Sequence, residues 1–244
     1  MLVKQWFIGW DVGGWNCDKN PKSRDAIVIL DANRKLVGRP WRGNLRKVIN
    51  KHSTTYDWVV ELFKLCRSDI SLKDSSVTLA IDTPLGFSEA FLQLATETKP
   101  VTSIEESCTN PYLFRRTERF LFEHGHTPLS AIKDMIGSQA TKGMHVLACY
   151  APKVIDCGVW GDGSLLTAIE SYPSPCEKSV LIKNLRQPYF ELGHSDFEDA
   201  LTCALVASLF AQRREELVPP EDNISNREGW IWIPTDALSR ARVG

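Results

Sequence analysis

The amino-acid sequence predicts an α/β fold in which one mixed, five-stranded sheet is flanked by helices. Two observations carry this prediction. Strand-like segments at the start of the chain are joined by short turns, which is typical of an antiparallel meander. An amphipathic helix then leads to a further strand, and this strand–helix–strand order indicates a parallel crossover.

The meander begins with the aromatic and β-branched run Trp6–Val12, which is closed by Gly13 and Gly14. Its second strand is expected at Asp25–Leu30, before a turn that is rich in Asp and Asn. Its third strand is expected at Lys35–Trp41. Because the connections are short, each strand should lie antiparallel to the one before it.

The crossover helix is expected from about Tyr56 to Arg67, where apolar residues recur at helical spacing. It leads to a fourth strand at Val77–Asp82. The segment from roughly 84 to 164 shows no convincing strand, so we expect a helical insertion there. Its helical pieces are expected near 87–97, 112–124 and 130–149.

The fifth strand is expected after the insertion, at Leu165–Tyr172. Residues 196–212 then form a predicted helix that is apolar on almost all sides, which is typical of a buried helix. Trp230–Pro234 is a candidate edge strand near the end of the chain. This order of elements predicts one sheet with helices on its faces.

The composition excludes several classes of protein. A chain of 244 residues, 43% hydrophobic and 24% charged, can bury a core and is unlike a disordered or collagen-like chain. No apolar run approaches the roughly 20 residues of a membrane span, so no membrane partner is expected. The net charge of −1 argues against a surface coated in basic residues, although a total does not describe distribution. Seven cysteines without a C-x-x-C pair favour a reducing, cytoplasmic location.

Acidic residues stand at the predicted ends of three strands. Asp11 ends the first strand and Asp82 ends the fourth, and these strands should be parallel neighbours. Their carboxylates should therefore converge at the sheet edge where ligands of α/β sheets usually bind. Glu170 ends the fifth strand. Strand-end acids also form turns or face solvent, so each acid alone has a structural explanation.

The start of the last helix carries more acids than its structure requires. Ser195 and Glu198 fit a capping box, which explains two of the polar residues. Asp199 instead lines up with an apolar stripe, where a carboxylate needs a partner such as a divalent cation. Asp196, three residues earlier, can face the same ion.

Several carboxylates around one point cannot all stay ionised without a cation. Hard oxygen ligands without clustered Cys or His favour Mg²⁺ or Mn²⁺. Such ions can activate water for attack on a phosphodiester. The candidate metal ligands are Asp11, Asp82, Asp196 and Asp199, and Glu170 is a further candidate catalytic residue.

Five short motifs, in this order, resemble the RNase H-like fold, in particular its RuvC-type branch. They are Asp11–Trp15, Ile81–Gly86, Glu170–Pro173, Asp196–Leu201 and Glu228–Ile231. More closely, the chain is similar to the predicted nucleases of domain-of-unknown-function family 429. The resemblance implies a single RNase H-like domain over 1–244 with a helical insertion at roughly 84–164. It also implies a metal-dependent nuclease whose metal site contains Asp11, Asp82 and Asp199, with Asp196 and Glu170 close by.

Two basic regions are candidates for binding a nucleic acid substrate, either DNA or RNA. The stretch 34–51 contains no acid and includes Arg42, Arg46 and Lys47, which could follow a phosphate backbone. A solvated strand edge explains it equally well. The predicted helix at 112–124 adds arginines that could overhang the site and bind phosphate, or could pair with Glu118. These are Arg115, Arg116 and Arg119.

Two other functions remain open at this point. Asp11–Gly14 resembles the first phosphate loop of the actin and sugar-kinase phosphotransferases, but no second glycine-rich loop follows. The chain is also short for two such domains around a cleft. A non-catalytic nucleic-acid-binding module on the same fold is the third possibility.

Overall fold

The computed structural model describes residues 3–104 and 106–238, in which eight strands form one mixed sheet. The strand order is β3-β2-β1-β4-β7-β6-β5, and β8 pairs with β7. The remaining residues of the expected 1–244 domain, at 1–2, 105 and 239–244, lie outside the described residues. The strands are β1 (Lys4–Asp11), β2 (Asp25–Asp31), β3 (Trp41–Gly43), β4 (Ser75–Asp82), β5 (Lys153–Asp156), β6 (Val159–Gly161), β7 (Leu166–Ser171) and β8 (Ile231–Trp232).

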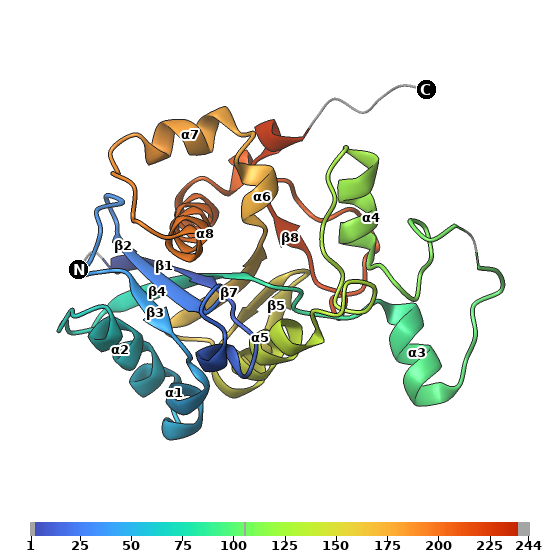
Figure 1. Ribbon diagram of the computed structural model, residues 1–244, viewed down its shortest axis with the longest axis horizontal. Helices are drawn as coiled ribbons and strands as arrows, with labels where there is room; N and C mark the ends of the chain where they lie inside the picture. The colour runs from blue at the N-terminus through green and yellow to red at the C-terminus, as the bar shows by residue number, and fades with distance from the viewer. Residues whose placement is uncertain (1–2, 105, 239–244) are drawn as a thin grey trace.

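Helices cover both faces of this sheet (Figure 1). One face packs against α8 together with α6 and α7, and the other packs against α1, α2 and α5, while α3 and α4 lie towards one end. The helices are α1 (Arg46–Lys51), α2 (Thr55–Leu65), α3 (Glu89–Glu97), α4 (Arg116–Glu123), α5 (Gly137–Tyr150), α6 (Pro173–Cys176), α7 (Val180–Arg186) and α8 (Ser195–Gln212). The predicted α/β class with a mixed, helix-flanked sheet is therefore confirmed.

The meander and the crossover give the sheet its two kinds of pairing. Strand β2 lies antiparallel to both β1 and β3. Strands β1, β4 and β7 are parallel to one another, and α2 connects the meander to β4. Both the antiparallel start and the parallel centre follow the sequence prediction.

The number of strands was predicted wrongly, because the segment expected to be only helical contains a hairpin. Strands β5 and β6 pair antiparallel around a turn at Gly158, whose φ is +70°, and β6 joins β7. These strands are only four and three residues long, and β5 is exposed throughout, so no period-2 pattern marks them. The third strand also begins later than expected, at Trp41, while Leu36 makes only an isolated bridge.

Side chains alternate strictly between the two faces of β1. Phe7 packs into the core beneath α8, whereas Ile8 and Trp10 pack into the core that contains α2 and α5. Gly9 shares the α8 face, and a β-carbon there would lie 1.8 Å from the carbonyl oxygen of Ala200. Only glycine allows this close approach, so α8 lies directly on β1.

Helix α8 is the buried helix that the sequence predicted. Its residues from Ala200 to Leu209 are buried without interruption. Its N-cap is His194 rather than the expected Ser195, because the His194 side chain accepts a hydrogen bond from the Asp196 amide.

Among the described residues, no helix combines the length and apolarity needed to cross a membrane.

Candidate active site

Asp11 and Asp82 lie side by side at the ends of two parallel strands. The register of β1 and β4 pairs them directly, and neighbouring strands are about 4.8 Å apart. Each is an even number of residues from a side chain that packs beneath α8, Phe7 in β1 and Ala80 in β4. Both carboxylates therefore point to the α8 face at the carboxyl end of the sheet, as the sequence predicted.

Asp199 reaches this pair because α8 lies so close to β1. It precedes Ala200, which contacts Gly9, and Gly9 lies two residues before Asp11 on the same face. The structure thus brings a strand-end pair and a helix-start acid together from three separate parts of the chain. Gly9 makes this approach possible, and nothing in the sequence indicates that it has this role.

Burial and the charges of nearby carboxylates raise the pKa of all three residues. Burial raises the pKa of Asp11 to about 9, and the charges of Asp82 and Asp199 add to that effect. Burial and then the charge of Asp199 raise the pKa of Asp82 well above its usual range. Burial is also the first cause that raises the pKa of Asp199 to about 6. A cation between them would relieve this repulsion.

Other acids near the site are neutralised by basic partners, but these three are not. Asp25 pairs with Lys142, and Asp196 accepts the Arg42 Nε at 2.6 Å and the Arg24 amide at 3.0 Å. Asp11, Asp82 and Asp199 make no ion pair or side-chain hydrogen bond within residues 3–104 and 106–238. Asp196 was a candidate metal ligand, and the structure instead binds it to Arg42.

Glu170 does not join the carboxylate group, contrary to the prediction. It lies opposite Ile81 in the β4–β7 register, so its side chain points to the α5 face. There it accepts two hydrogen bonds from Arg115, at 2.6 Å and 2.8 Å, and one from the Leu85 amide at 2.9 Å. Its oxygens are therefore already bound, and Ser171 occupies the next position, on the same face as Asp82.

Two hydroxyl groups that the sequence reading missed border the same space. Ser171 is 1% exposed and Thr83 is 5% exposed, and neither side-chain oxygen has a hydrogen-bond partner among the described residues. An unpaired buried hydroxyl is costly, so such groups often mark a place where a ligand or water binds. Ser171 follows Glu170 in β7, so the alternation of side chains along that strand was the signal that could have identified it.

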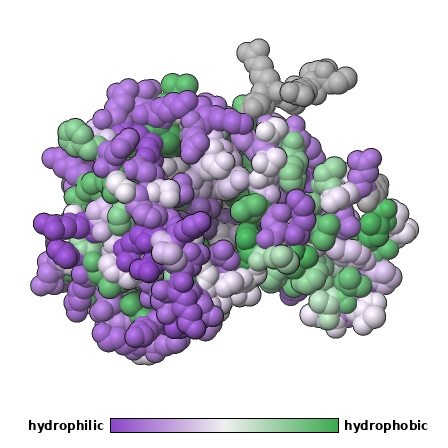
Figure 2. Space-filling view, viewed as in Figure 1, coloured by the Kyte–Doolittle hydropathy of each residue, from purple (hydrophilic) through white to green (hydrophobic). Residues whose placement is uncertain are grey.

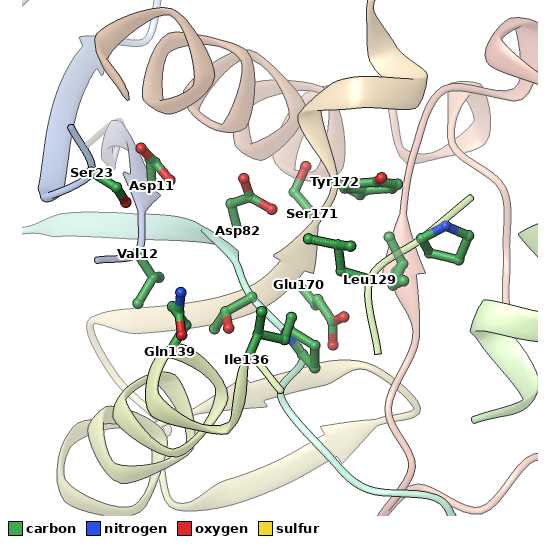
Figure 3. Close-up of a pocket in the computed structure, with 14 residues that line it drawn as sticks. Asp11, Val12, Ser23, Asp82, Leu129, Ile136, Gln139, Glu170, Ser171 and Tyr172 are labelled. Atoms are coloured by element: carbon green, nitrogen blue, oxygen red, sulfur yellow. The ribbon is translucent and has the colours of Figure 1, made fainter. Parts of the chain in front are cut away.

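A pocket of about 210 Å³ lies at this edge of the sheet (Figure 3). Asp11 and Asp82 lie at one end of it, and Leu129 and Tyr172 lie at the other. The remaining lining residues are Val12, Ser23, Thr83, Pro84, Pro128, Ile136, Gln139, Glu170, Ser171 and Ile231. The pocket therefore has an acidic end and a mainly apolar end.

The fit of a divalent cation rests on the chemistry of these donors. As the side chains stand, no three His, Cys, Asp or Glu residues of the described chain form a group that could hold a metal ion. Asp11 and Asp82 nevertheless provide adjacent carboxylates without partners, and Asp199 lies close enough to affect their charge. Such a set of hard oxygen donors suits Mg²⁺ or Mn²⁺.

A buried lysine, missed by the sequence reading, fixes the loop that follows Asp11. Lys142 of α5 is 0% exposed and pairs with Asp25, and its Nζ donates to the Gly13 carbonyl at 3.1 Å. Asp25 in turn accepts the Gly13 amide at 2.9 Å. The pair thus holds the backbone immediately after Asp11 in place.

The predicted substrate-binding residues of the first basic region remain near the surface. Arg46 lies in α1 and donates to Asn16 at 2.6 Å, while Lys47 is exposed and makes no side-chain hydrogen bond or ion pair with the described residues. Figure 2 shows that the surface over α1 is hydrophilic. Arg42 is already bound to Asp196, so it offers less to a substrate.

In the second basic region, the structure shows the pairing with Glu118 and contradicts the overhang that presents arginines to phosphate. Arg115 is 2% exposed and bound to Glu118 and Glu170. Arg116 binds two acids, Glu221 and Glu123. Arg119 lines a separate pocket between α4 and the segment 221–228. Arg115 and Arg116 therefore hold the insertion to the rest of the fold.

No protein-family model matches this chain, and no match was found among curated proteins or solved structures.

Proposed function

We propose that this protein is a metal-dependent nuclease that hydrolyses phosphodiester bonds in nucleic acid. The observation that carries the proposal is the group of three unpaired acids, Asp11, Asp82 and Asp199, at the carboxyl end of the parallel strands. Burial, and after it the charge of neighbouring carboxylates, raises the pKa of each carboxyl, and a divalent cation would offset that concentration of negative charge.

The strand order supports an RNase H-like core for this nuclease. Strands β1 to β4 form the meander and crossover that the resemblance implies, and β7 follows the insertion as the expected fifth strand. The hairpin β5–β6 and the short β8 extend that core at the β7 side. The proposed acids occupy β1, β4 and α8, as the resemblance implies.

The protein's own residues would bind and orient the reactants. Asp11 and Asp82 would hold Mg²⁺ or Mn²⁺, with Asp199 as a third ligand. The bound ion would activate a water molecule and offset charge on the phosphate. The unpaired hydroxyls of Ser171 and Thr83 would donate hydrogen bonds to substrate oxygens. Lys47, exposed on α1, is a candidate contact for more distant phosphates.

The phosphotransferase alternative has less support. A phosphate loop needs free backbone amides, yet the Gly13 amide donates to Asp25 and the Trp15 amide donates to Ser138 at 3.0 Å. Two donors of the candidate loop are therefore engaged within the protein. The non-catalytic module can be distinguished from the nuclease by its response to metal. A chain without a metal site should gain no thermal stability from Mn²⁺.

The experiment incubates end-labelled single- and double-stranded DNA and RNA with the purified protein in millimolar Mn²⁺ or Mg²⁺. Cleavage is expected with the wild-type protein and should be lost in Asp82→Asn. Asp69→Asn, in an exposed loop, is the matched control and should cleave normally. A wild-type protein that cleaves none of these substrates, or an Asp82→Asn variant of full activity, would refute the proposal.

A further inference from the structure

The pocket at the acidic site continues past the carboxylates into an apolar region (Figure 3). Leu129 is 51% exposed there, and Tyr172 and Ile136 are partly exposed beside it. The Tyr172 hydroxyl donates to the Thr127 carbonyl at 3.1 Å, which orients the aromatic ring. An apolar and aromatic wall is therefore held next to a group of carboxylates.

Unsatisfied polar groups lie between the two ends. The buried hydroxyls of Thr83 and Ser171 border the pocket without partners, and the partly exposed Gln139 amide also lines it. Hydroxyls and amides can both donate and accept hydrogen bonds. The expected ligand thus has a flat apolar surface with polar atoms at its edge, and a negative group of that ligand could approach Asp11 and Asp82 only through the cation proposed between them.

We propose that this pocket holds one unstacked base of a single-stranded nucleic acid. The inference rests on the proposed nuclease function and names the substrate of the same site as a single strand. The base packs against Leu129 and Tyr172, and its polar edge accepts hydrogen bonds from Ser171 and Thr83. Its phosphate then lies towards the carboxylates at the other end of the pocket.

The pocket has room for one base. Its volume is about 210 Å³, and Leu129 and Tyr172 line its apolar end. Bases in a duplex are paired and stacked, so one must leave the helix before it can enter such a pocket. A single strand avoids much of that cost and gains stacking on the protein.

The test is a base-removal scan on short, end-labelled single strands of DNA and of RNA. Each strand lacks one base at a different position, and binding is followed by fluorescence anisotropy in Ca²⁺, a hard cation that also takes oxygen ligands. In the wild-type protein, loss of one particular base is expected to weaken binding about 10-fold, the size of one lost stacking contact. Loss of any other base should have a smaller effect.

The variant Leu129→Ala then identifies the pocket as the place where that base binds. Because the variant removes part of the wall, loss of the same base should now weaken binding only about 2- to 3-fold. Leu94→Ala is the matched control, since Leu94 is an exposed leucine on α3 that does not line the pocket. It should keep the wild-type pattern. Identical patterns in all three proteins, with DNA and RNA alike, would overturn the proposal, as would a duplex that binds as tightly as the strand.

The variant Ser171→Ala gives an independent readout. Removal of a hydroxyl that bonds the substrate should weaken binding of the complete strand about 2- to 10-fold. The melting temperature should be unchanged or higher, because a buried hydroxyl without a protein partner is also removed. Unchanged binding with a lower melting temperature would show that Ser171 serves packing alone and would contradict its proposed role.

The outcomes also separate this inference from the nuclease proposal. Cleavage of nucleic acid without base-dependent binding would overturn the base pocket and support the nuclease. Base-dependent binding without cleavage in Mn²⁺ or Mg²⁺ would support the base pocket and overturn the nuclease.

Discussion

The acids on the strands differ in their partners between the two faces of the sheet. On the α5 face, Asp25 pairs with Lys142 and Glu170 pairs with Arg115. On the α8 face, Asp11 and Asp82 have no basic partner among the described residues, and burial followed by neighbouring carboxylate charge raises the pKa of both. A protein can stabilise carboxylates by pairing them, and the unpaired state of these two at the open end of the strands is the reason we propose a cation site there.

The largest loss of stability is expected where a paired acid loses its basic partner. Lys142→Met should destabilise the protein by about 3–5 kcal/mol, because Asp25 would remain as a buried, uncompensated charge. Urea unfolding measures the loss, and Lys47→Met at an exposed position is the matched control. A loss below about 1 kcal/mol would mean that the pair on the α5 face is dispensable.

Mn²⁺ should stabilise the protein through the unpaired acids. At 100 times the dissociation constant, ligand binding adds about 2.7 kcal/mol, which corresponds to roughly 5–10 °C in melting temperature for a chain of this size. Differential scanning fluorimetry with and without Mn²⁺ measures the shift. Asp82→Asn should abolish it, whereas Asp69→Asn should retain it. The comparison fails if both variants respond alike.

In the absence of metal, an Asp→Asn substitution should raise the stability of the protein on one face of the sheet and lower it on the other. At pH 7, Asp11→Asn should stabilise the protein, by a few kcal/mol at most, because folding no longer forces an acid with a pKa of about 9 to take up a proton. Asp25→Asn should destabilise it, since Lys142 would lose its counter-charge. Urea unfolding in EDTA compares the two, and equal signs would contradict the distinction between the faces.

A smaller effect is expected in the pH dependence of stability without metal. A raised carboxyl pKa stabilises the fold at low pH, and that contribution is lost as the pH rises from about 4 through the folded pKa. Asp199 contributes this loss up to about pH 6 and Asp11 up to about pH 9. Stability should therefore fall between pH 6 and 9 in the wild type and less steeply in Asp11→Asn. Parallel urea midpoints for the two proteins across this range would refute it.

The central part of the site could be predicted because it lies at the ends of strongly patterned strands. Asp11 and Asp82 follow apolar runs whose parallel pairing is indicated by the crossover. Glu170 was misassigned because strand alternation reverses with each residue, and the register that points Ser171 to the site is set by pairing with β4. A shift of one residue in the β4–β7 register would exchange the faces of Glu170 and Ser171.

The rest depended on contacts between distant parts of the chain. The nearby partner of Arg115, Glu118, could be expected from the sequence, but its burial depends on a second partner, Glu170, in the distant strand β7. Lys142 likewise has its partner in β2. Strands β5 and β6 are too short to show a period, so the helical prediction for that segment missed them.

Crystals soaked in Mn²⁺ would test the central claim most directly. The account predicts an anomalous density peak at the carboxyl ends of β1 and β4, between Asp11 and Asp82 and within reach of Asp199. Crystals of Asp82→Asn, soaked in the same way, should lose that peak. Wild-type crystals with no peak at these carboxylates would contradict the account.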